Sequence, residues 1–171
     1  MASLEIITYP DERLKQVAQP VERFDEALRR FVERLEQTMR DAPGGVGIAA
    51  PQVGHLFRIA IVDVSSRPKI ASNGRMVLIN PEILSWEGMV KGREGCMSVP
   101  DFTGNVVRAE CITVSALDET GRQREYRCTG YEARAVQHEI DHLDGLLFLD
   151  RLVSRRTDLF PRKNYGSRKS A

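Results

Sequence analysis

Two histidines and a glutamate stand close together in segment 137–142, which reads QHEIDH. In a helix, His138 and His142 lie on one face about 6 Å apart, so both imidazoles can bind one metal ion. Glu139, beside the first histidine, is close enough to exchange protons with a water molecule at that metal. The alternative is a polar helix face with solvated histidines. The chain has only three histidines, and the spacing of these two favours a metal site.

A metal ion needs a further ligand, and the sequence limits where that ligand comes from. Zinc peptidases with two histidines at this spacing use a later histidine or glutamate. Neither residue type follows His142 in this chain, which argues against a metallopeptidase. Upstream, Cys96 lies between a glycine and a Met-Ser-Val-Pro run, a context that suits a thiolate exposed in a loop. A small buried core thiol is the alternative for Cys96.

A third segment, 44–54, is rich in glycine and alanine and reads GGVGIAAPQVG. It lacks the Lys-Ser/Thr pair of a phosphate-binding loop and departs from the GxGxxG dinucleotide pattern at Ala50, so nucleotide binding is disfavoured. Small side chains let a backbone approach closely, which suits an extended peptide that lies beside this segment as an added strand. Gln52 can offer an amide donor to a developing oxyanion. A tight loop packed on the preceding helix is the alternative.

The elements that must position these residues follow from the hydrophobic pattern. Asp25 caps a predicted helix whose apolar residues recur on one face, and Pro43 marks its end. A second helix is predicted from Thr129, with a capping box to Glu132, to a stop at Gly145. Between the helices, β-type runs are predicted at 56–64, 76–79, 83–86, 106–116 and 125–128, with a hairpin turn at 118–121. The sequence thus predicts an α+β fold, with mostly antiparallel strands around a central metal-binding helix.

Length and composition are those of one ordinary globular domain. The chain has 171 residues, of which 42% are hydrophobic and 29% are charged. No apolar run approaches the ~20 residues of a membrane span, and the N-terminus has no signal-peptide pattern. We therefore expect no membrane partner and a cytoplasmic location. Three cysteines without a CxxC pair argue against a secreted disulfide framework.

Charge is unevenly distributed along the chain. The net charge is +1, yet residues 151–171 hold seven basic residues and one acidic residue. The rest of the chain is therefore acidic overall, which disfavours a DNA-binding surface on the main body. We expect a catalytic domain at 1–152 followed by a basic tail at 153–171. Two interpretations of the tail remain open, a solvated terminus or a segment that binds the ribosome through its RNA.

Three segments together closely resemble the signature motifs of the peptide deformylase family. They are residues 45–52, 94–98 and 137–142, and their order and separation also fit. The resemblance extends from about residue 6 to residue 152. It implies metal-dependent hydrolysis that removes the formyl group from N-formylmethionyl nascent peptides and releases formate, a step of co-translational N-terminal processing.

The resemblance also implies a ligand set. Cys96, His138 and His142 would bind one divalent metal ion, with Fe(II) as the native ion in many members of the family. Imidazole and thiolate ligands suit zinc, nickel and cobalt as well, so the sequence does not name the metal.

Further roles follow from the same resemblance. Glu139 would be the general base and acid, with Gln52 and the backbone N–H of Met97 as oxyanion donors. The residues expected to bind substrate are Gly45, Val46, Gly47, Gly95, Tyr131 and Ala135. Val136 is a further candidate for the wall of the methionine pocket, although core packing explains such apolar residues equally well.

Two other functions remain to be distinguished. A metallopeptidase would cleave internal peptide bonds, whereas a non-catalytic ribosome-associated module would hold a structural metal with four protein ligands.

One further residue of the helix motif, Asp141, has a predicted place. Asp141 lies about 100° from His142 around the helix, so we expect it to form a surface salt bridge rather than to support a ligand.

Overall fold

The computed structural model describes residues 3–162, which form two α-helices, three short 3-10 helices and eight strands. The helices are α1 (Glu26–Asp41) and α2 (Gly130–Leu143), with η1 (Glu12–Lys15), η2 (Ala50–Val53) and η3 (Phe148–Arg151). The strands are β1 (Gly47–Ala49), β2 (Ile59–Val62), β3 (Met76–Glu87), β4 (Val90–Cys96), β5 (Val99–Arg108), β6 (Cys111–Leu117), β7 (Gln123–Thr129) and β8 (Leu159–Pro161).

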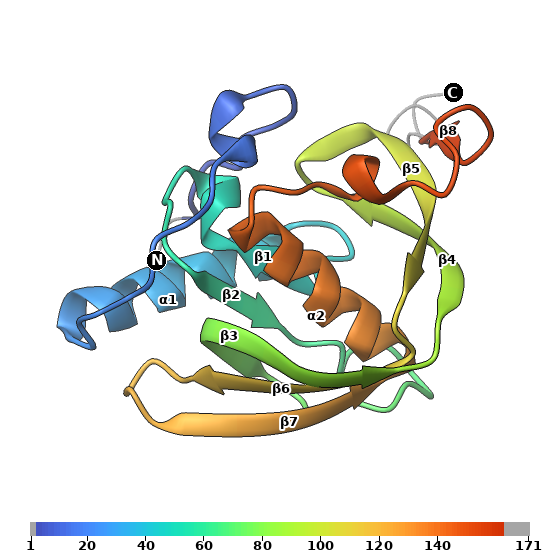
Figure 1. The fold of residues 1–171 in the computed structure, drawn as a ribbon. Helices are drawn as coiled ribbons and strands as arrows, with labels where there is room; N and C mark the ends of the chain where they lie inside the picture. The colour runs from blue at the N-terminus through green and yellow to red at the C-terminus, as the bar shows by residue number, and fades with distance from the viewer. Residues whose placement is uncertain (1–2, 163–171) are drawn as a thin grey trace.

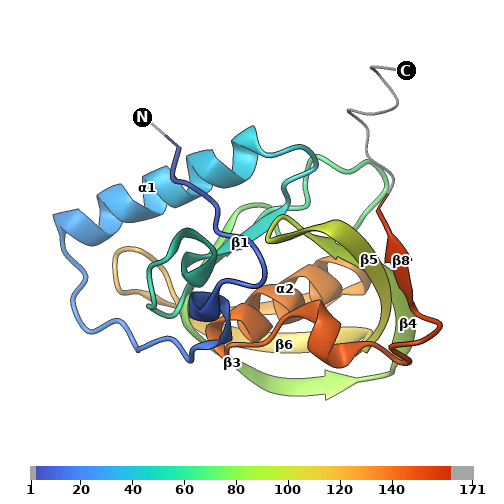
Figure 2. The same cartoon turned by 90° about the horizontal axis from the view of Figure 1, so that it is seen from above.

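Helix α2 lies in the middle of the molecule, with the strands and α1 arranged around it (Figure 1, Figure 2). The strands form a five-stranded sheet of order β1-β2-β3-β6-β7 and a three-stranded sheet of order β4-β5-β8. Every pairing within the two sheets is antiparallel. The predicted α+β fold, with antiparallel strands around a central helix, is confirmed.

The five-stranded sheet carries a helix on each face. Successive side chains of a strand point to opposite faces of the sheet, and here the side chains on both faces are apolar. In β2, Ile59 and Ile61 belong to the core cluster formed with α1, whereas Ala60 and Val62 belong to the cluster formed with α2. The sheet thereby fixes the position of α2, on which the histidines lie.

The helix ends agree with the predictions except for one cap. Asp25 accepts a hydrogen bond at 3.0 Å from the backbone N–H three residues on and so begins α1. Gly145, with a φ of 76°, follows α2 as expected. The predicted capping box at Thr129 is wrong, because the Thr129 side chain makes no capping bond. Glu132 is instead buried and accepts hydrogen bonds from the backbone and side-chain amides of Asn73, at 2.7 and 2.6 Å.

The hydrophobic pattern located strands β2, β3, β6 and β7 of the large sheet, but not all of their ends, and it did not indicate β1. The runs at 76–79 and 83–86 are one strand, β3, which contains two register shifts against β6. The run at 106–116 is divided between β5 and β6. The hairpin turn at 118–121 is confirmed, with the Gly121 N–H donating to the carbonyl of Asp118 at 2.9 Å. Strands β4 and β8 and most of β5 are rich in glycine, charge or proline, and the pattern does not indicate them.

The C-terminal segment folds back onto β5. Strand β8 pairs with β5 at Thr103↔Phe160 and Gly104↔Leu159. Leu159 packs against a third core cluster, which includes Phe148. The first part of the predicted basic tail therefore packs against the body, whereas residues 163–171 lie outside the described residues. The boundary at residue 152 stays a prediction.

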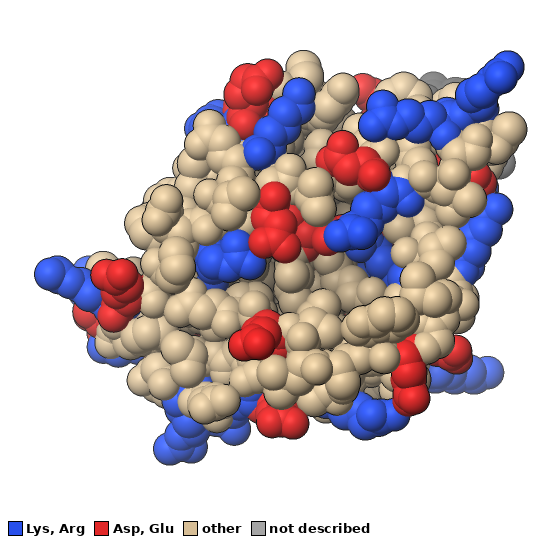
Figure 3. All heavy atoms as spheres, in the orientation of Figure 1, with Lys and Arg blue, Asp and Glu red and all other residues tan. Residues whose placement is uncertain are grey.

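Charged side chains of both signs are intermingled on the face seen in Figure 3, around a shallow hollow near its centre. Ion pairs such as Arg58–Asp144 at 2.9 Å and Arg75–Glu119 at 2.8 Å join neighbouring elements of the fold. Among residues 3–162, no helix is long and apolar enough to cross a membrane.

Candidate metal and catalytic site

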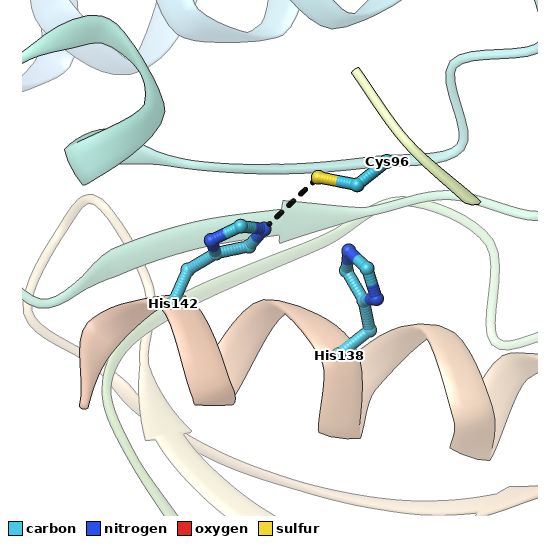
Figure 4. A group of neighbouring side chains, drawn as sticks. All are labelled: Cys96, His138 and His142. Atoms are coloured by element: carbon cyan, nitrogen blue, oxygen red, sulfur yellow. Dashed lines mark hydrogen bonds between the residues drawn. The ribbon is translucent and has the colours of Figure 1, made fainter. Parts of the chain in front are cut away.

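Three potential metal ligands from two elements meet beside α2 (Figure 4). Cys96 ends β4, and His138 and His142 lie one turn apart on α2. One ligand atom from each lies within 4.8 Å of the others, and Cys96 Sγ is 3.3 Å from His142 Nε2. All three side chains are buried. The structure thus brings together the three residues that the sequence motifs single out.

This donor set fits one tetrahedral metal ion. Metal–sulfur bonds of ~2.3 Å and metal–nitrogen bonds of ~2.0 Å separate two ligand atoms by roughly 3.5 Å, close to the observed distance between Cys96 and His142. Burial lowers the pKa of His142 well below its ordinary value, which keeps its imidazole in the neutral form that binds metals. Within the described range, no other histidine, cysteine or carboxylate joins the cluster as a fourth ligand. Three protein ligands are typical of a catalytic metal site, which keeps a position for water or substrate.

A buried ion network orients His138. Its Nδ1 is 2.9 Å from Oε1 of Glu94. The Glu94 carboxylate also accepts two hydrogen bonds from Arg108, each at 2.9 Å, and one from Arg134 at 2.7 Å. Burial by itself raises the pKa of Glu94, but hydrogen bonds from Arg108 and His138 outweigh burial and hold that pKa well below its ordinary value. Glu94 therefore stays ionised, and its carboxylate holds Nδ1 of His138 in a hydrogen bond. The other ring nitrogen, Nε2, is left to bind the metal.

The network continues to Asp141, for which the prediction of a surface salt bridge is wrong. Asp141 is only 6% exposed, and it accepts hydrogen bonds at 2.6 Å from both Arg108 and Arg151. The helix does turn Asp141 away from the ligands, but the face that it reaches is covered by Arg108. Asp141 therefore supports His138 indirectly, through Arg108 and Glu94.

Glu139 lies buried between the ligands and β1. Its carboxylate occupies the space that a side chain at Gly47 would take, since a Cβ atom there would lie 2.6 Å from Glu139 Oε2. Oε1 of Glu139 is also buried, and it has no hydrogen-bond partner among the described residues. Burial raises the pKa of Glu139 to about 7. A carboxyl group with such a pKa can both accept and release a proton near neutral pH.

Gln52 is buried and is held in one orientation. Its Oε1 accepts a hydrogen bond from the Ala49 N–H at 2.9 Å, and its Nε2 donates to Ser98 Oγ at 3.1 Å and to Cys96 Sγ at 3.5 Å. A fixed amide donor thus stands next to a predicted metal ligand. Met97, the residue after Cys96, borders the same space.

A cavity of about 670 Å³ opens onto Cys96, His138 and Glu139. Such a volume is within the range of ligand-binding pockets. All the residues expected to bind substrate line it, namely Gly45, Val46, Gly47, Gly95, Tyr131 and Ala135. Val136 does not line it, because its side chain faces the core cluster between α2 and the large sheet.

Several residues of the site were not identified from the sequence. Glu94 belongs to the motif at 94–98, but its bond to His138 was not predicted, because no strand was predicted around Cys96 and nothing in the sequence placed the two side chains on one face. Arg108 and Arg134 had no signal in the sequence, since their contacts depend on how β5 and α2 pack. The same holds for Phe160 and Arg162, which reach the cavity only because β8 returns to β5.

Comparison with known proteins identifies the family. Residues 3–158 match the family model described as polypeptide deformylase. A peptide deformylase of Thermodesulfovibrio yellowstonii is 44% identical over 169 residues, which cover 99% of this chain and 100% of the relative.

The fold is similar to that of solved structures as well. A peptide deformylase from Legionella pneumophila is 44% identical, with a TM-score of 0.83 over 91% of this chain and 90% of its own. One from Ehrlichia chaffeensis, in complex with actinonin, is 37% identical, with a TM-score of 0.84 over 91% of this chain and 92% of its own. Since these matches run along nearly the whole chain, it belongs to the polypeptide deformylase family.

Proposed function

We propose that this chain hydrolyses the N-terminal formyl group of N-formylmethionyl nascent peptides, with Cys96, His138 and His142 as the ligands of the metal that the reaction needs. The observation that carries this assignment is the cluster of these three groups beside a cavity that Cys96, His138 and the buried Glu139 carboxylate line. The chain is thus a metal-dependent hydrolase of protein biosynthesis. Because its substrate is the nascent chain, we place it in the cytoplasm.

The substrate would lie between two sheet edges. In the described sheets, β1 and β4 are both terminal strands, and both border the cavity. An extended peptide can therefore pair with the backbone beside Val46 on one side and beside Gly95 on the other. The methionine side chain would then point to α2, where Tyr131 and Ala135 form part of the cavity wall.

The roles of the polar groups follow from their positions. When bound by Cys96, His138 and His142, a divalent cation would supply a Lewis acid that lowers the pKa of water and polarises a carbonyl group. Glu139 accepts the proton of the attacking water and returns it to the departing amine. The Gln52 amide and the Met97 N–H stabilise the negative charge that develops on the formyl oxygen. Formate and a free methionyl amine are the products.

Formate release from a formyl-Met tripeptide tests this function directly. The protein should be purified without oxygen, and its metal content should be measured on the same sample. We expect the rate of formate release to rise in proportion to the metal content, and we expect no cleavage of internal peptide bonds. Cleavage within an unformylated peptide would instead identify a metallopeptidase.

We propose Fe(II) as the native metal, which leads to a prediction about oxygen. Cys96 lines the open cavity, and a thiolate beside a redox-active ion is an easy target for oxygen or peroxide. The iron form should therefore lose activity in air, whereas the nickel form should keep it. Residual activity and the oxidation state of Cys96, followed over time in both forms, check this. If both forms decay at the same rate, unfolding rather than oxidation causes the loss.

We also propose that the basic tail contacts the ribosome. The test keeps β8 intact and replaces five basic residues of the tail by serine in the full chain, namely Arg155, Arg156, Lys163, Arg168 and Lys169. Co-sedimentation with ribosomes at low salt should fall, and that of the unchanged chain should weaken steeply as salt rises. Hydrolysis of a free formyl-Met peptide should be the same for both. Binding that is equal in both, or independent of salt, would leave the tail without this role.

A further inference from the structure

Four arginines line the catalytic cavity, and three of them have no carboxylate partner among residues 3–162. The four are Arg67, Arg93, Arg134 and Arg162. Arg134 is neutralised by Glu94 and also donates to the carbonyls of Val90 and Val106. For Arg67, Arg93 and Arg162, the described part of the chain provides no ion pair, only neutral contacts. The cavity wall therefore carries positive charge that no carboxylate of the described residues pairs with.

Arg93 and Arg162 are held at one place by the C-terminal strand. The guanidinium of Arg93 lies 3.8 Å from the centre of the Phe160 ring and donates to Asn105 and Thr103. Arg162 follows β8, and it donates from its side chain to the carbonyl of Cys96 at 3.4 Å. Nε of Arg162 is buried and has no hydrogen-bond partner among residues 3–162. A buried donor without a partner is costly, and an anion nearby would relieve that cost.

The register of β4 shows which part of a substrate would meet these arginines. Residues rise about 3.3 Å each along a strand, so Arg93 lies roughly 10 Å from Cys96, the length of about three substrate residues. Side chains alternate, and Glu94 and Cys96 are buried towards α2, whereas Arg93 and Gly95 are exposed on the other side. A peptide whose methionine points to α2 thus turns its next side chain to the side of Arg93.

We propose that Arg93 and Arg162 make this enzyme select substrates with an acidic side chain at one of the two residues that follow formyl-methionine. The inference rests on the proposed function and specifies its substrate class. Arginine is suited to the task because its planar guanidinium binds a carboxylate through two hydrogen bonds. Phe160 fixes the Arg93 guanidinium in advance, which reduces the entropy lost on binding. Arg67, which lies over the Tyr131 ring at the same cavity, adds to the positive potential.

The test compares matched peptides that end in an amide, so that no terminal carboxylate interferes. Formyl-Met-X-Ser-amide and formyl-Met-Ser-X-amide, with X as Glu, Gln or Lys, are assayed for kcat/KM at low and at high salt. We expect Glu to exceed Gln by about five-fold or more at one of the two positions, and Lys to be poorest there. The preference should shrink as salt rises.

Variants separate this inference from its alternatives. In Arg93→Gln and Arg162→Gln, the ratio of kcat/KM for Glu to that for Gln should fall towards one, whereas Arg29→Gln, on the exposed surface of α1, should keep the ratio of the unchanged chain. The ratio is read within each variant, so a general loss of activity does not affect it. Equal rates for the Glu and Gln peptides, or a preference that survives both substitutions, would overturn the inference while leaving the proposed function intact. No hydrolysis of any formylated peptide would overturn the proposed function itself.

Discussion

Glu139→Gln should retain its metal and lose between about 10²- and 10⁴-fold of kcat for a formyl-Met peptide, the usual contribution of general acid–base catalysis. The amide has the size of the carboxylate, so it fits the space over Gly47 and leaves the helix unchanged. It cannot accept the proton of the attacking water. Formate release under single-turnover conditions, with metal content measured on the same sample, checks both parts of the prediction.

The matched controls are the ligand variants. Cys96→Ala, His138→Ala and His142→Ala should lose both metal and activity, because each removes one of three donors. Glu139→Gln thus differs from the ligand variants, because it is expected to be inactive and still to bind the metal. If its kcat stayed within about ten-fold of the unchanged chain, Glu139 would not be the proton acceptor of this reaction.

The ligand site was predictable because its geometry is local. Two histidines four residues apart share a helix face wherever that helix is placed, so His138 and His142 needed no knowledge of the fold. Cys96 is distant in sequence, and its place beside them depends on the pairing of β4 with β5. Only the resemblance of three motifs to one family linked Cys96 to the histidines.

The support of the site was not predictable to the same degree. The prediction for Asp141 failed because the position of a residue around a helix tells which way its side chain points, but not which part of the fold covers that face. The face that Asp141 occupies is covered by Arg108, which comes from the end of β5. The capping box at Thr129 failed for a similar reason, since Asn73, from another part of the chain, takes both oxygens of Glu132.

The C-terminal strand shows the limit of hydrophobic patterning. Residues 159–161 read Leu-Phe-Pro within a strongly basic segment, and a run of three residues has no detectable period. Strand β8 forms because β5 offers it an edge, at Phe102, Thr103 and Gly104. A side chain at Gly104 would collide with Leu152, which shows how closely the C-terminal segment packs there.

The buried network behind His138 leads to the second prediction, which concerns Glu94. Glu94→Gln should lower the free energy of unfolding by about 3–5 kcal/mol, because it leaves the buried guanidinium of Arg108 without one of its two carboxylates. It should also weaken metal binding by about 10–100-fold, since the anionic partner of the His138 Nδ1 is gone. Unfolding by urea is measured on metal-free protein, so that lost metal does not contribute to the first value. Competition with a chelator gives the second.

A second substitution shows whether the effect comes from the unpaired charge. In Glu94→Gln combined with Arg108→Met, the buried cation is removed together with its partner, so the double variant should be more stable than the sum of the two single effects predicts. Its metal affinity should stay as low as that of Glu94→Gln, because His138 still lacks its anionic partner. Glu26→Gln is the matched control, since that carboxylate is 62% exposed and pairs with Arg29 on the surface. If the two single effects simply added, or if metal affinity recovered in the double variant, the buried ion network would not be what orients His138.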